Sequence, residues 1–184
     1  RFAPAAYNGN VYFVSDDGYL YCLRAEDGTL RWKFKGGPAE RKVLGNDRLI
    51  DIYPARGAPV VYDGNVYFAA SIWPLMGVFI HALDAETGEV LWTNSGTGSM
   101  YIPQQHDGPA FSGIAPQGYL AATEELLLVA GGQTVPAAFD RRTGELVHYN
   151  LHSRRMGSKG GGGYQVRVGD GFVVNRGDMY RLAD

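Results

Sequence analysis

The sequence contains one cysteine, Cys22, and no long run of apolar residues. A single cysteine cannot form a disulfide within this segment, so cysteine usage does not reveal the redox compartment. The apolar run at 126–130 is far too short to cross a bilayer, and no charged-then-apolar leader of the signal-peptide type is present. The sequence thus predicts no membrane span and leaves the compartment open. Cys22 itself we expect to be a small core residue.

The sequence also lacks an excess of charge of either sign. Its 184 residues include 17 Lys and Arg against 19 Asp and Glu, which gives a formal net charge of −2. Nucleic acids and anionic membranes require clustered positive charge, so this balance argues against both as partners. The hydrophobic fraction of 45% and the charged fraction of 20% are those of an ordinary globular protein.

Glycine and aromatic residues are abundant, and no stretch has the pattern of a helix. The 26 glycines, 12 tyrosines and 8 phenylalanines are typical of tight turns that join aromatic-rich strands. One phrase occurs twice: RFAPAAYNGNVYF at 1–13 and RGAPVVYDGNVYF at 56–68 share nine of thirteen residues. A second phrase occurs three times, as YCLRAEDGTLRW at 21–32, IHALDAETGEVLW at 80–92 and AAFDRRTGELVHY at 137–149. Repeats of this period indicate stacked copies of one supersecondary unit.

Each copy predicts four short strands. In the second copy the runs APVVYD, VYFAA, VFIHALDA and EVLWTN follow one another, with Asp63-Gly64 at the first junction and Thr87-Gly88 at the third. Dipeptides of this kind between apolar runs are strong hairpin signals. A four-stranded antiparallel meander that is repeated radially is a blade of a β-propeller.

The predicted fold is therefore all-β, a partial propeller of about three and a half four-stranded antiparallel blades. The repeats cover approximately residues 1–35, 54–94, 112–150 and 163–184. A blade takes about 40–45 residues, so the ring does not close within this chain. We expect the chain to be a fragment of a longer protein whose remaining blades complete the ring.

The repeated phrases resemble those of pyrroloquinoline-quinone (PQQ)-type β-propellers over nearly the whole chain. This family includes the quinoprotein alcohol dehydrogenases and the propeller of the outer-membrane protein assembly factor. The family's pattern for docking one blade on the next is Ala, then Asp two residues on, Thr-Gly, and a closing Trp. One set matches it in full: Ala82, Asp84, Thr87, Gly88 and Trp92. The resemblance implies that the tryptophan of an outer strand lies over the turn of a neighbouring blade.

The other two copies depart from this docking pattern. The first copy keeps Gly28 and Trp32 but has Cys22, Arg24 and Asp27 at the remaining positions. The third keeps Ala138, Asp140, Thr143 and Gly144, but has His148 in place of the tryptophan. An indole over a turn buries up to roughly 150–250 Å². We therefore expect Trp32 and Trp92 to fasten blades together and His148 to do so more weakly; a role of the tryptophans as a ligand platform is the alternative.

The lengths of the connections predict two different faces. In an antiparallel meander the first and third turns lie on one face, and the second turn and the crossover to the next blade lie on the other. The tight turns that can be placed from the sequence fall on the first face. The long connections fall on the second, at 36–53, 71–77, 94–113, 131–136 and 152–163. Long loops on a rigid scaffold commonly carry the binding site, so the second face is the predicted ligand surface.

Two arginines, Arg1 and Arg56, begin the innermost strands of two blades and are expected on this ligand surface near the central channel. A guanidinium there either holds an anion or carboxylate, or pairs with an acidic neighbour or with loop carbonyls. In the third copy Gly113 stands at the matching place.

The other candidate ligand residues lie in two inserted loops, SIWPLMG and MYIPQQHDG. They are Trp73 in the first loop and Tyr101, Gln104, Gln105 and His106 in the second. Trp73 either packs over the adjacent blade or projects to meet a partner. The mixture of aromatic, amide and imidazole groups in the second loop suits a polar ligand, and hydrogen bonding within the loop is the alternative.

Two classes of function remain open. The first is a non-catalytic scaffold that presents its loop-rich face to a protein, peptide or glycan. The second, implied by the resemblance, is part of a quinoprotein dehydrogenase, in which PQQ with bound calcium oxidises an alcohol or sugar. The vicinal Cys-Cys pair of that family is missing and no C-x-x-C-H haem site is present. We therefore expect no catalytic residue, metal or cofactor in this segment, and by resemblance a periplasmic or other extracytoplasmic compartment.

Overall fold

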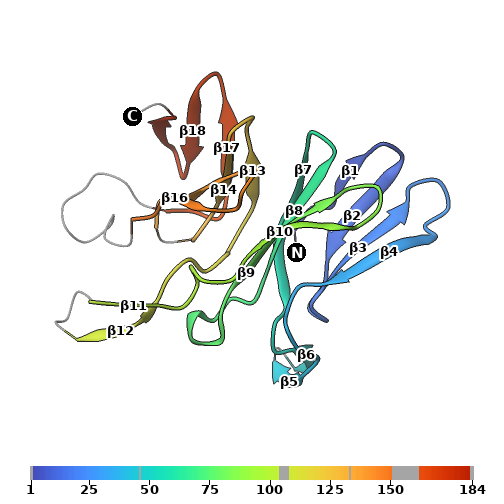
Figure 1. Cartoon of the computed structure of the whole chain (residues 1–184), viewed down its shortest axis with the longest axis horizontal. Coiled ribbons are helices and arrows are strands. Elements are labelled where there is room, and N and C mark those ends of the chain that lie inside the picture. The colour runs from blue at the N-terminus through green and yellow to red at the C-terminus, as the bar shows by residue number, and fades with distance from the viewer. Residues whose placement is uncertain (1, 46, 104–107, 133, 151–161, 183–184) are drawn as a thin grey trace.

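The computed structural model describes residues 2–45, 47–103, 108–132, 134–150 and 162–182. Within these residues the protein is built from strands, apart from one 3-10 turn, η1 (Pro74–Met76). No helix in the described part is long and apolar enough to cross a membrane. The predicted all-β fold is confirmed (Figure 1).

Four antiparallel sheets follow one another along the chain and fan out as successive blades (Figure 1). Blade 1 consists of β1 (Ala5–Tyr7), β2 (Asn10–Val14), β3 (Tyr19–Arg24) and β4 (Leu30–Lys35). Blade 2 consists of β7 (Ala55–Tyr62), β8 (Asn65–Ala70), β9 (Phe79–Asp84) and β10 (Val90–Asn94). Blade 3 consists of β13 (Leu120–Ala122), β14 (Leu126–Val129), β15 (Ala137–Asp140) and β16 (Leu146–His148). Blade 4 has three described strands, β17 (Val166–Gly169), β18 (Phe172–Asn175) and β19 (Asp178–Arg181).

Within each blade every strand pairs with the next one along the chain, which is the predicted meander. The sheets form no closed ring over the described residues. The first turn of blades 1 and 2 shows why the register is fixed. Asn8 and Asp63 have φ values of 45° and 51°, and the glycines that follow them, Gly9 and Gly64, have values of 73° and 74°. Two successive left-handed residues are what a two-residue hairpin requires, and Asn-Gly or Asp-Gly adopts them at little cost.

Two of the long connections contain hairpins of their own. Strands β5 (Lys42–Gly45) and β6 (Arg48–Asp51) lie between blades 1 and 2, and β11 (Met100–Pro103) and β12 (Pro109–Ser112) lie between blades 2 and 3. From the sequence both segments are predicted to be loops, because they are insertions between copies and the repeat offers no template for them.

The second inserted hairpin corrects one alignment made from the sequence. Since β12 extends to Ser112, the inner strand of blade 3 begins at Leu120, and the match of Gly113 with Arg56 is wrong. Arg56 lies opposite Ala69 in blade 2. The equivalent place in blade 3 belongs to Gln117, whose N–H donates to the Ala130 carbonyl at 2.9 Å.

Apolar side chains fill the space between successive blades. Strand β8 is buried on both faces because blade 2 lies between two others. Val66 and Phe68 belong to the core between blades 1 and 2, whereas Tyr67 and Ala69 belong to the core between blades 2 and 3. A third cluster, around Leu128, joins blade 3 to blade 4. This double burial explains why the strand reads as a continuous apolar run.

The two ends of each blade differ. In blade 2 the turns at Gly64 and Gly88 lie at one end, here called the hairpin-turn face, and Arg56 and Trp73 lie at the other, the loop-rich face. Both inserted hairpins project on the loop-rich face, at the lower edge of Figure 1. Tight turns are not confined to the first face, however. The connections at 15–18 in blade 1 and 176–177 in blade 4 are also tight and lie on the loop-rich face.

Candidate binding site on the loop-rich face

Tryptophans of the outer strands hold successive blades together. The indole Nε1–H of Trp32 in β4 donates to a carbonyl of the blade 2 turn at 3.0 Å, and its ring covers Gly88. Trp92 in β10 repeats this contact one blade further, with a donated bond of 2.9 Å and its ring over Gly144. Ala82, which pairs with Trp92 across β9 and β10, is fully buried. Small residues, alanine across the strand pair and glycine in the turn, leave room for the indole rings.

The turns beneath the two indoles are shaped by aspartate side chains. Asp84 Oδ1 accepts two backbone N–H groups of its own turn at 2.9 and 2.7 Å, and also the hydroxyl of Thr87 at 3.0 Å. Asp140 Oδ1 accepts two backbone N–H groups at 2.8 Å each. These bonds hold the pKa of both carboxyls below the ordinary value. In blade 1 Arg24 takes the aspartate's place, and Asp27 organises the turn by accepting from the residue two further on.

Tyrosines of the second strand complete the interfaces between blades 1 and 2 and between blades 2 and 3, and they were not among the residues predicted from the sequence. The hydroxyl of Tyr12 donates to the Ala85 carbonyl at 2.8 Å, and its ring lies beside Trp32 with centroids 5.9 Å apart. Tyr67 holds the same place in blade 2, but its hydroxyl accepts a hydrogen bond from Arg141 Nη1 at 3.0 Å. The signal for these residues was present in the sequence, because both copies contain the phrase NVYF.

A hollow of about 670 Å³ opens on the loop-rich face between blades 1 and 2. It is lined by the segment before β1, the end of β2 and the turn after it, the β6 strand of the first inserted hairpin, and the inner strand β7 of blade 2. Its apolar wall includes Phe2, Phe13 and Leu49, and its charged residues are Asp16, Asp17, Arg48 and Arg56. The docking of blade 1 on blade 2 fixes the walls that these two blades contribute, so the shape of the hollow depends on the packing of the blades.

Asp16 lies between two arginines of the hollow. Its Oδ1 is 3.3 Å from Arg56 Nε, and its Oδ2 contacts Arg48 Nη2. The contact with Arg56 is an ion pair without the alignment of a hydrogen bond, because the buried Nε has no hydrogen-bond partner among the described residues. The sequence left open whether Arg56 meets a ligand or an acidic neighbour, and the neighbour is Asp16. One carboxylate shared by two guanidinium groups leaves this trio with a net positive charge.

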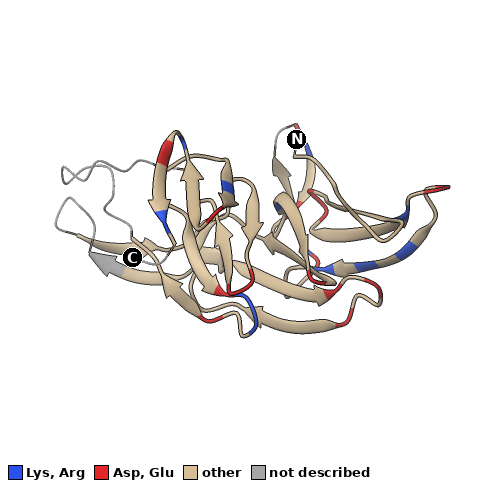
Figure 2. Ribbon diagram, turned by 90° about the horizontal axis from the view of Figure 1, so that it is seen from above, with Lys and Arg blue, Asp and Glu red and all other residues tan. Residues whose placement is uncertain are grey.

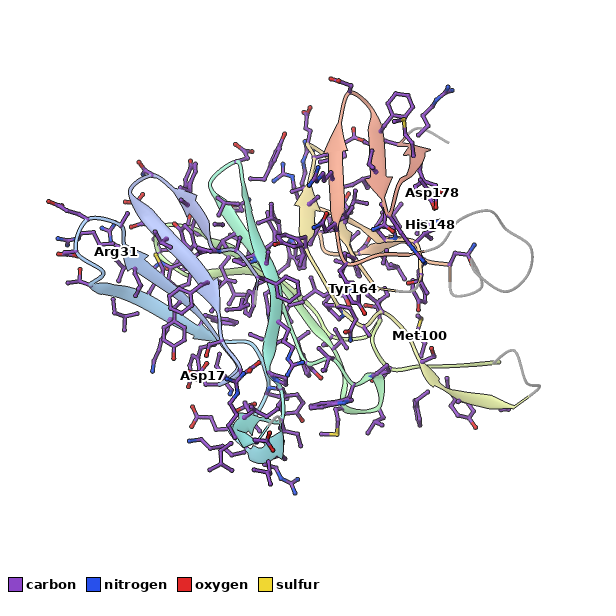
Figure 3. The ribbon with its side chains drawn as sticks, turned by 180° about the vertical axis from the view of Figure 1, so that it is seen from behind. Asp17, Arg31, Met100, His148, Tyr164 and Asp178 are labelled. Carbon is purple, nitrogen blue, oxygen red and sulfur yellow. The ribbon has the colours of Figure 1, made fainter. Side chains whose placement is uncertain are left out.

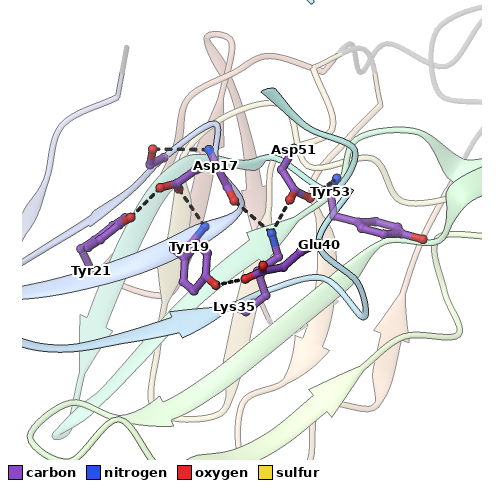
Figure 4. A network of polar contacts seen from close by, with 8 residues as sticks. Asp17, Tyr19, Tyr21, Lys35, Glu40, Asp51 and Tyr53 are labelled. Atoms are coloured by element: carbon purple, nitrogen blue, oxygen red, sulfur yellow. Dashed lines mark hydrogen bonds and ion pairs between the residues drawn. The ribbon is translucent and has the colours of Figure 1, made fainter. Parts of the chain in front are cut away.

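A polar network holds the β5–β6 hairpin against blade 1 (Figure 4). Lys35 Nζ lies 2.5 Å from Asp51 Oδ2 and donates to the Asp17 carbonyl at 3.0 Å. The other Asp51 oxygen accepts the Tyr53 N–H at 2.8 Å. The side chain of Asp51 is 5% exposed, so removal of Lys35 would leave a buried, unpaired carboxylate. This pair anchors the base of the hairpin.

Two tyrosines extend the same network. The hydroxyl of Tyr21 donates to Asp17 Oδ2 at 2.5 Å, and that of Tyr19 donates to Glu40. Because a phenolate would face a carboxylate, the hydrogen bond raises the pKa of Tyr21 to about 12 and raises that of Tyr19 as well. Asp17 lies beside the inserted hairpin (Figure 3). These contacts fix the hairpin, and with it Arg48, at the edge of the hollow.

The structure does not gather the predicted ligand residues at one place. Arg56 lines the hollow, whereas Trp73, in the connection between β8 and β9, and Tyr101, in β11, are not part of its lining. The hollow also contains Asp16 and Arg48, which no repeat indicated. The remaining candidates, Arg1, Gln104, Gln105 and His106, lie outside the described residues.

Two side chains that could take part in chemistry, Cys22 and His81, lie in the core. No three or more of the described His, Cys, Asp and Glu side chains are arranged to hold a metal ion. Cys22 is fully buried, and burial raises the pKa of its thiol, which disfavours the nucleophilic thiolate. His81 is buried between Phe34 and Phe68, so its imidazole is not accessible to solvent as a general base would be.

Solved structures show where this fold occurs. The structure of BamB from Moraxella catarrhalis is similar, with a TM-score of 0.59 and 18% sequence identity, over 97% of this chain and 49% of that chain. At this level of identity the likeness shows the fold alone.

Several known proteins are similar in sequence to part of this chain. Tetrathionate hydrolase of Acidithiobacillus ferrooxidans is 35% identical over 114 residues, which are 60% of this chain and 20% of that protein. The dehydrogenase subunit of the quinone alcohol dehydrogenase of Gluconacetobacter polyoxogenes is 40% identical over 90 residues, which are 48% of this chain and 12% of that protein. The chain thus spans a small part of the length of these relatives.

A family model described as outer membrane protein assembly factor BamB matches two overlapping ranges, 2–100 and 52–179. Together they include the docking turns of blades 1 to 3 and nearly all of the described strands. By this match and by its blades, the chain belongs to the PQQ-repeat β-propeller family described as outer membrane protein assembly factor BamB.

Proposed function

We propose that this chain is a non-catalytic binding scaffold that presents its loop-rich face to a protein, peptide or glycan partner. The observation that carries the proposal is the hollow with Asp16 between Arg48 and Arg56. Its charged groups are already paired and held by the blade and the anchored hairpin. A site that is ordered before it binds loses little entropy on binding.

The chemistry of the hollow defines what a partner must offer. Phe2, Phe13 and Leu49 supply apolar surface, while the guanidinium of Arg48 is 60% exposed and still has donors to spare. A partner segment that combines a carboxylate or a row of hydroxyl groups with an apolar body matches both. The compartment we propose is periplasmic or otherwise extracytoplasmic, by membership of the family.

The test is a screen of the purified chain against peptide and glycan arrays, followed by titration of the selected ligands. Replacing both Arg48 and Arg56 by Ala should weaken the selected ligands about tenfold or more, because two charge-assisted contacts are lost. Arg142→Ala on the hairpin-turn face is the matched control and should leave affinity unchanged. Equal losses of affinity in the double variant and in Arg142→Ala, or the failure of every peptide and glycan on the arrays to bind, would contradict the proposal.

A second candidate function is part of a PQQ-dependent dehydrogenase, with PQQ and calcium as its cofactors. The 40% identity to a quinone alcohol dehydrogenase subunit favours it. The described residues of the hollow do not fit this group well, because Asp16 is held by two arginines and Asp17 by Tyr21. Neither carboxylate is free to take a calcium ion without breaking these contacts.

Calorimetric titration of the chain with PQQ and calcium chloride separates the two candidates. The scaffold proposal expects no saturable uptake by this segment. Stoichiometric binding of PQQ and calcium that is lost in Asp16→Asn would favour the dehydrogenase function over the scaffold. Binding by the hollow of an array ligand, without PQQ uptake, supports the scaffold.

A further inference from the structure

One part of the loop-rich face is almost free of charge. From Thr93 to Tyr119 the sequence contains one residue with a formal charge, Asp107, and from Gly64 to Leu83 it contains none. The described parts of β11 and β12 and the connection between β8 and β9 therefore carry no Lys, Arg, Asp or Glu, and the charged positions concentrate on other strands and turns (Figure 2). In a chain with 20% charged residues this is a pronounced local deficit.

These two segments form one projection. The hydroxyl of Ser99, next to β11, donates to the carbonyl of Pro74 in η1, and η1 packs against β12. We call residues 72–79, 97–103 and 108–112 the uncharged projection. It extends from the same face as the hollow, below the blades in Figure 1, and Met100 marks its base in Figure 3.

Large apolar side chains are exposed on the uncharged projection. Leu75 is 69% exposed, Tyr101 61%, Phe111 59% and Trp73 37%. Tyr101 and Phe111 are cross-strand partners on one face of the hairpin, with ring centroids 5.1 Å apart. Trp32 and Trp92 donate their indole N–H within the protein, whereas Trp73 makes no such bond with a described residue. Exposed apolar side chains gathered in this way mark an interaction surface.

We propose that the uncharged projection docks on the interface of a lipid bilayer with zwitterionic headgroups. Tyrosine and tryptophan favour the headgroup level, where the ring is apolar and the polar atom stays hydrated, and leucine and phenylalanine reach the acyl boundary. None of the described residues of the projection is charged, which favours this partner because a charged side chain would have to be stripped of water to enter the interface. The side chains stand on a convex projection, which a fluid surface accommodates without matching pockets.

The overall charge of the chain agrees with this partner. A net charge of −2 provides no attraction to anionic lipids, so binding should depend on apolar contact. It should then be insensitive to salt, because screening acts on charges and not on apolar burial. The proposal is independent of the proposed function: the hollow can bind its partner with or without this contact.

The experiment is flotation of the full 184-residue chain with phosphatidylcholine vesicles in a density gradient. We expect the chain to float with the vesicles at both 0.1 and about 0.5 M salt, with a blue shift of tryptophan emission. The double variant Leu75→Glu, Phe111→Glu should lower the partition coefficient about tenfold or more. Leu30→Glu is the matched control, since Leu30 is also exposed but lies by the turn at the hairpin-turn face, and it should float as the parent chain does.

Each other outcome overturns the proposal. Failure to float, or equal losses in the double variant and in Leu30→Glu, would show that the projection does not contact lipid. If the chain floats only with anionic vesicles and salt abolishes this flotation, then it binds lipid through charge and not through the apolar side chains of the projection. Sedimentation equilibrium without lipid completes the test: a dimer that the double variant dissociates would place a second copy of the chain on the projection instead.

Discussion

Trp92 of blade 2 lies against Gly144 of blade 3, so closely that a Cβ on the glycine would be 2.4 Å from Cε3 of the indole. Trp32 covers Gly88 in the same way. The equivalent turn of blade 1 contains Gly28, with a φ of 73°, and no atom lies within 4 Å of its Cβ position. The same turn thus occurs covered and uncovered in one chain, which allows the docking contact to be measured against an internal reference.

Trp92→Ala should lower the free energy of unfolding by about 3–5 kcal/mol, because it removes an indole packed in an interface and leaves a cavity. It also removes the donor to the Arg141 carbonyl. Denaturation by urea measures the loss. The neighbouring Leu91 is exposed, and Leu91→Ala should change the free energy by less than about 0.5 kcal/mol. Similar values for both variants would mean that Trp92 does not fasten the blades.

Gly144→Ala should be more destabilising than Gly28→Ala. The two glycines have nearly the same left-handed backbone, with φ of 74° and 73°, so an alanine costs about 1 kcal/mol of backbone strain at either position. Only at Gly144 must the added methyl group displace an indole, which we expect to cost about 1–3 kcal/mol more. The difference between the two variants isolates the indole contact, and a difference near zero would contradict the docking geometry.

The blades and their docking tryptophans were accessible from the sequence because their signals are local. Asp63-Gly64 sets a hairpin by its own backbone preference, and the phrase around Trp92 repeats at a fixed spacing from its turn. The inserted hairpin at 42–51 was not accessible in this way. It has no second copy, and two four-residue strands are too short to show a clear alternation.

The candidate site was less predictable than the fold because its contacts join distant parts of the chain. The sequence leaves open whether Arg56 holds a ligand, pairs with an acid or bonds loop carbonyls, and it could not name Asp16, forty residues away, among 19 acidic residues. Arg48 joins this pair only because Lys35 and Asp51 anchor its hairpin. Such pairs depend on tertiary structure, and a single sequence contains no pattern for them.

Arg141 provides the next prediction, since its guanidinium is almost completely buried. It donates to the Glu124 carbonyl and to the Tyr67 hydroxyl, each at 3.0 Å, and lies over the ring of Tyr62 at 4.7 Å. Arg141→Met keeps the aliphatic stem but removes both donated hydrogen bonds and leaves the Glu124 carbonyl without its side-chain donor, and it should cost about 2–4 kcal/mol. The exposed neighbour Arg142 is the control, and Arg142→Met should stay within about 0.5 kcal/mol. Urea denaturation of the two variants side by side decides the matter.

The last prediction concerns His81, which joins blade 2 to the segment after blade 1. Its Nε2 hydrogen-bonds the Gly36 carbonyl at 2.8 Å and its Nδ1 the hydroxyl of Thr93 at 2.9 Å, so Nε2 carries the proton. The ring is 4% exposed and stacks on Phe68. Burial disfavours the imidazolium and lowers the pKa of His81 from 6.5 to about 4.

A lowered histidine pKa makes the folded state less stable in acid. Above pH 6.5 His81 is neutral in both states and the group adds no pH dependence. Between pH 6.5 and about 4 the unfolded chain binds a proton that the folded chain does not. The free energy of unfolding therefore decreases as the pH is lowered through this range. Over the whole interval the group contributes a loss of about 3 kcal/mol, and below pH 4 its contribution is constant.

The window from pH 6.5 to 4.5 is where this effect can be seen separately. Asp27, Asp84 and Asp140 have pKa values below their ordinary value, so the stability that they contribute is lost mainly at lower pH. His81→Gln keeps an N–H donor for the Gly36 carbonyl but cannot titrate, and its unfolding free energy should be flatter than that of the parent chain across this window. If His81→Gln retains the full slope, the acid sensitivity belongs to other groups, and the buried imidazole is protonated at an ordinary pH.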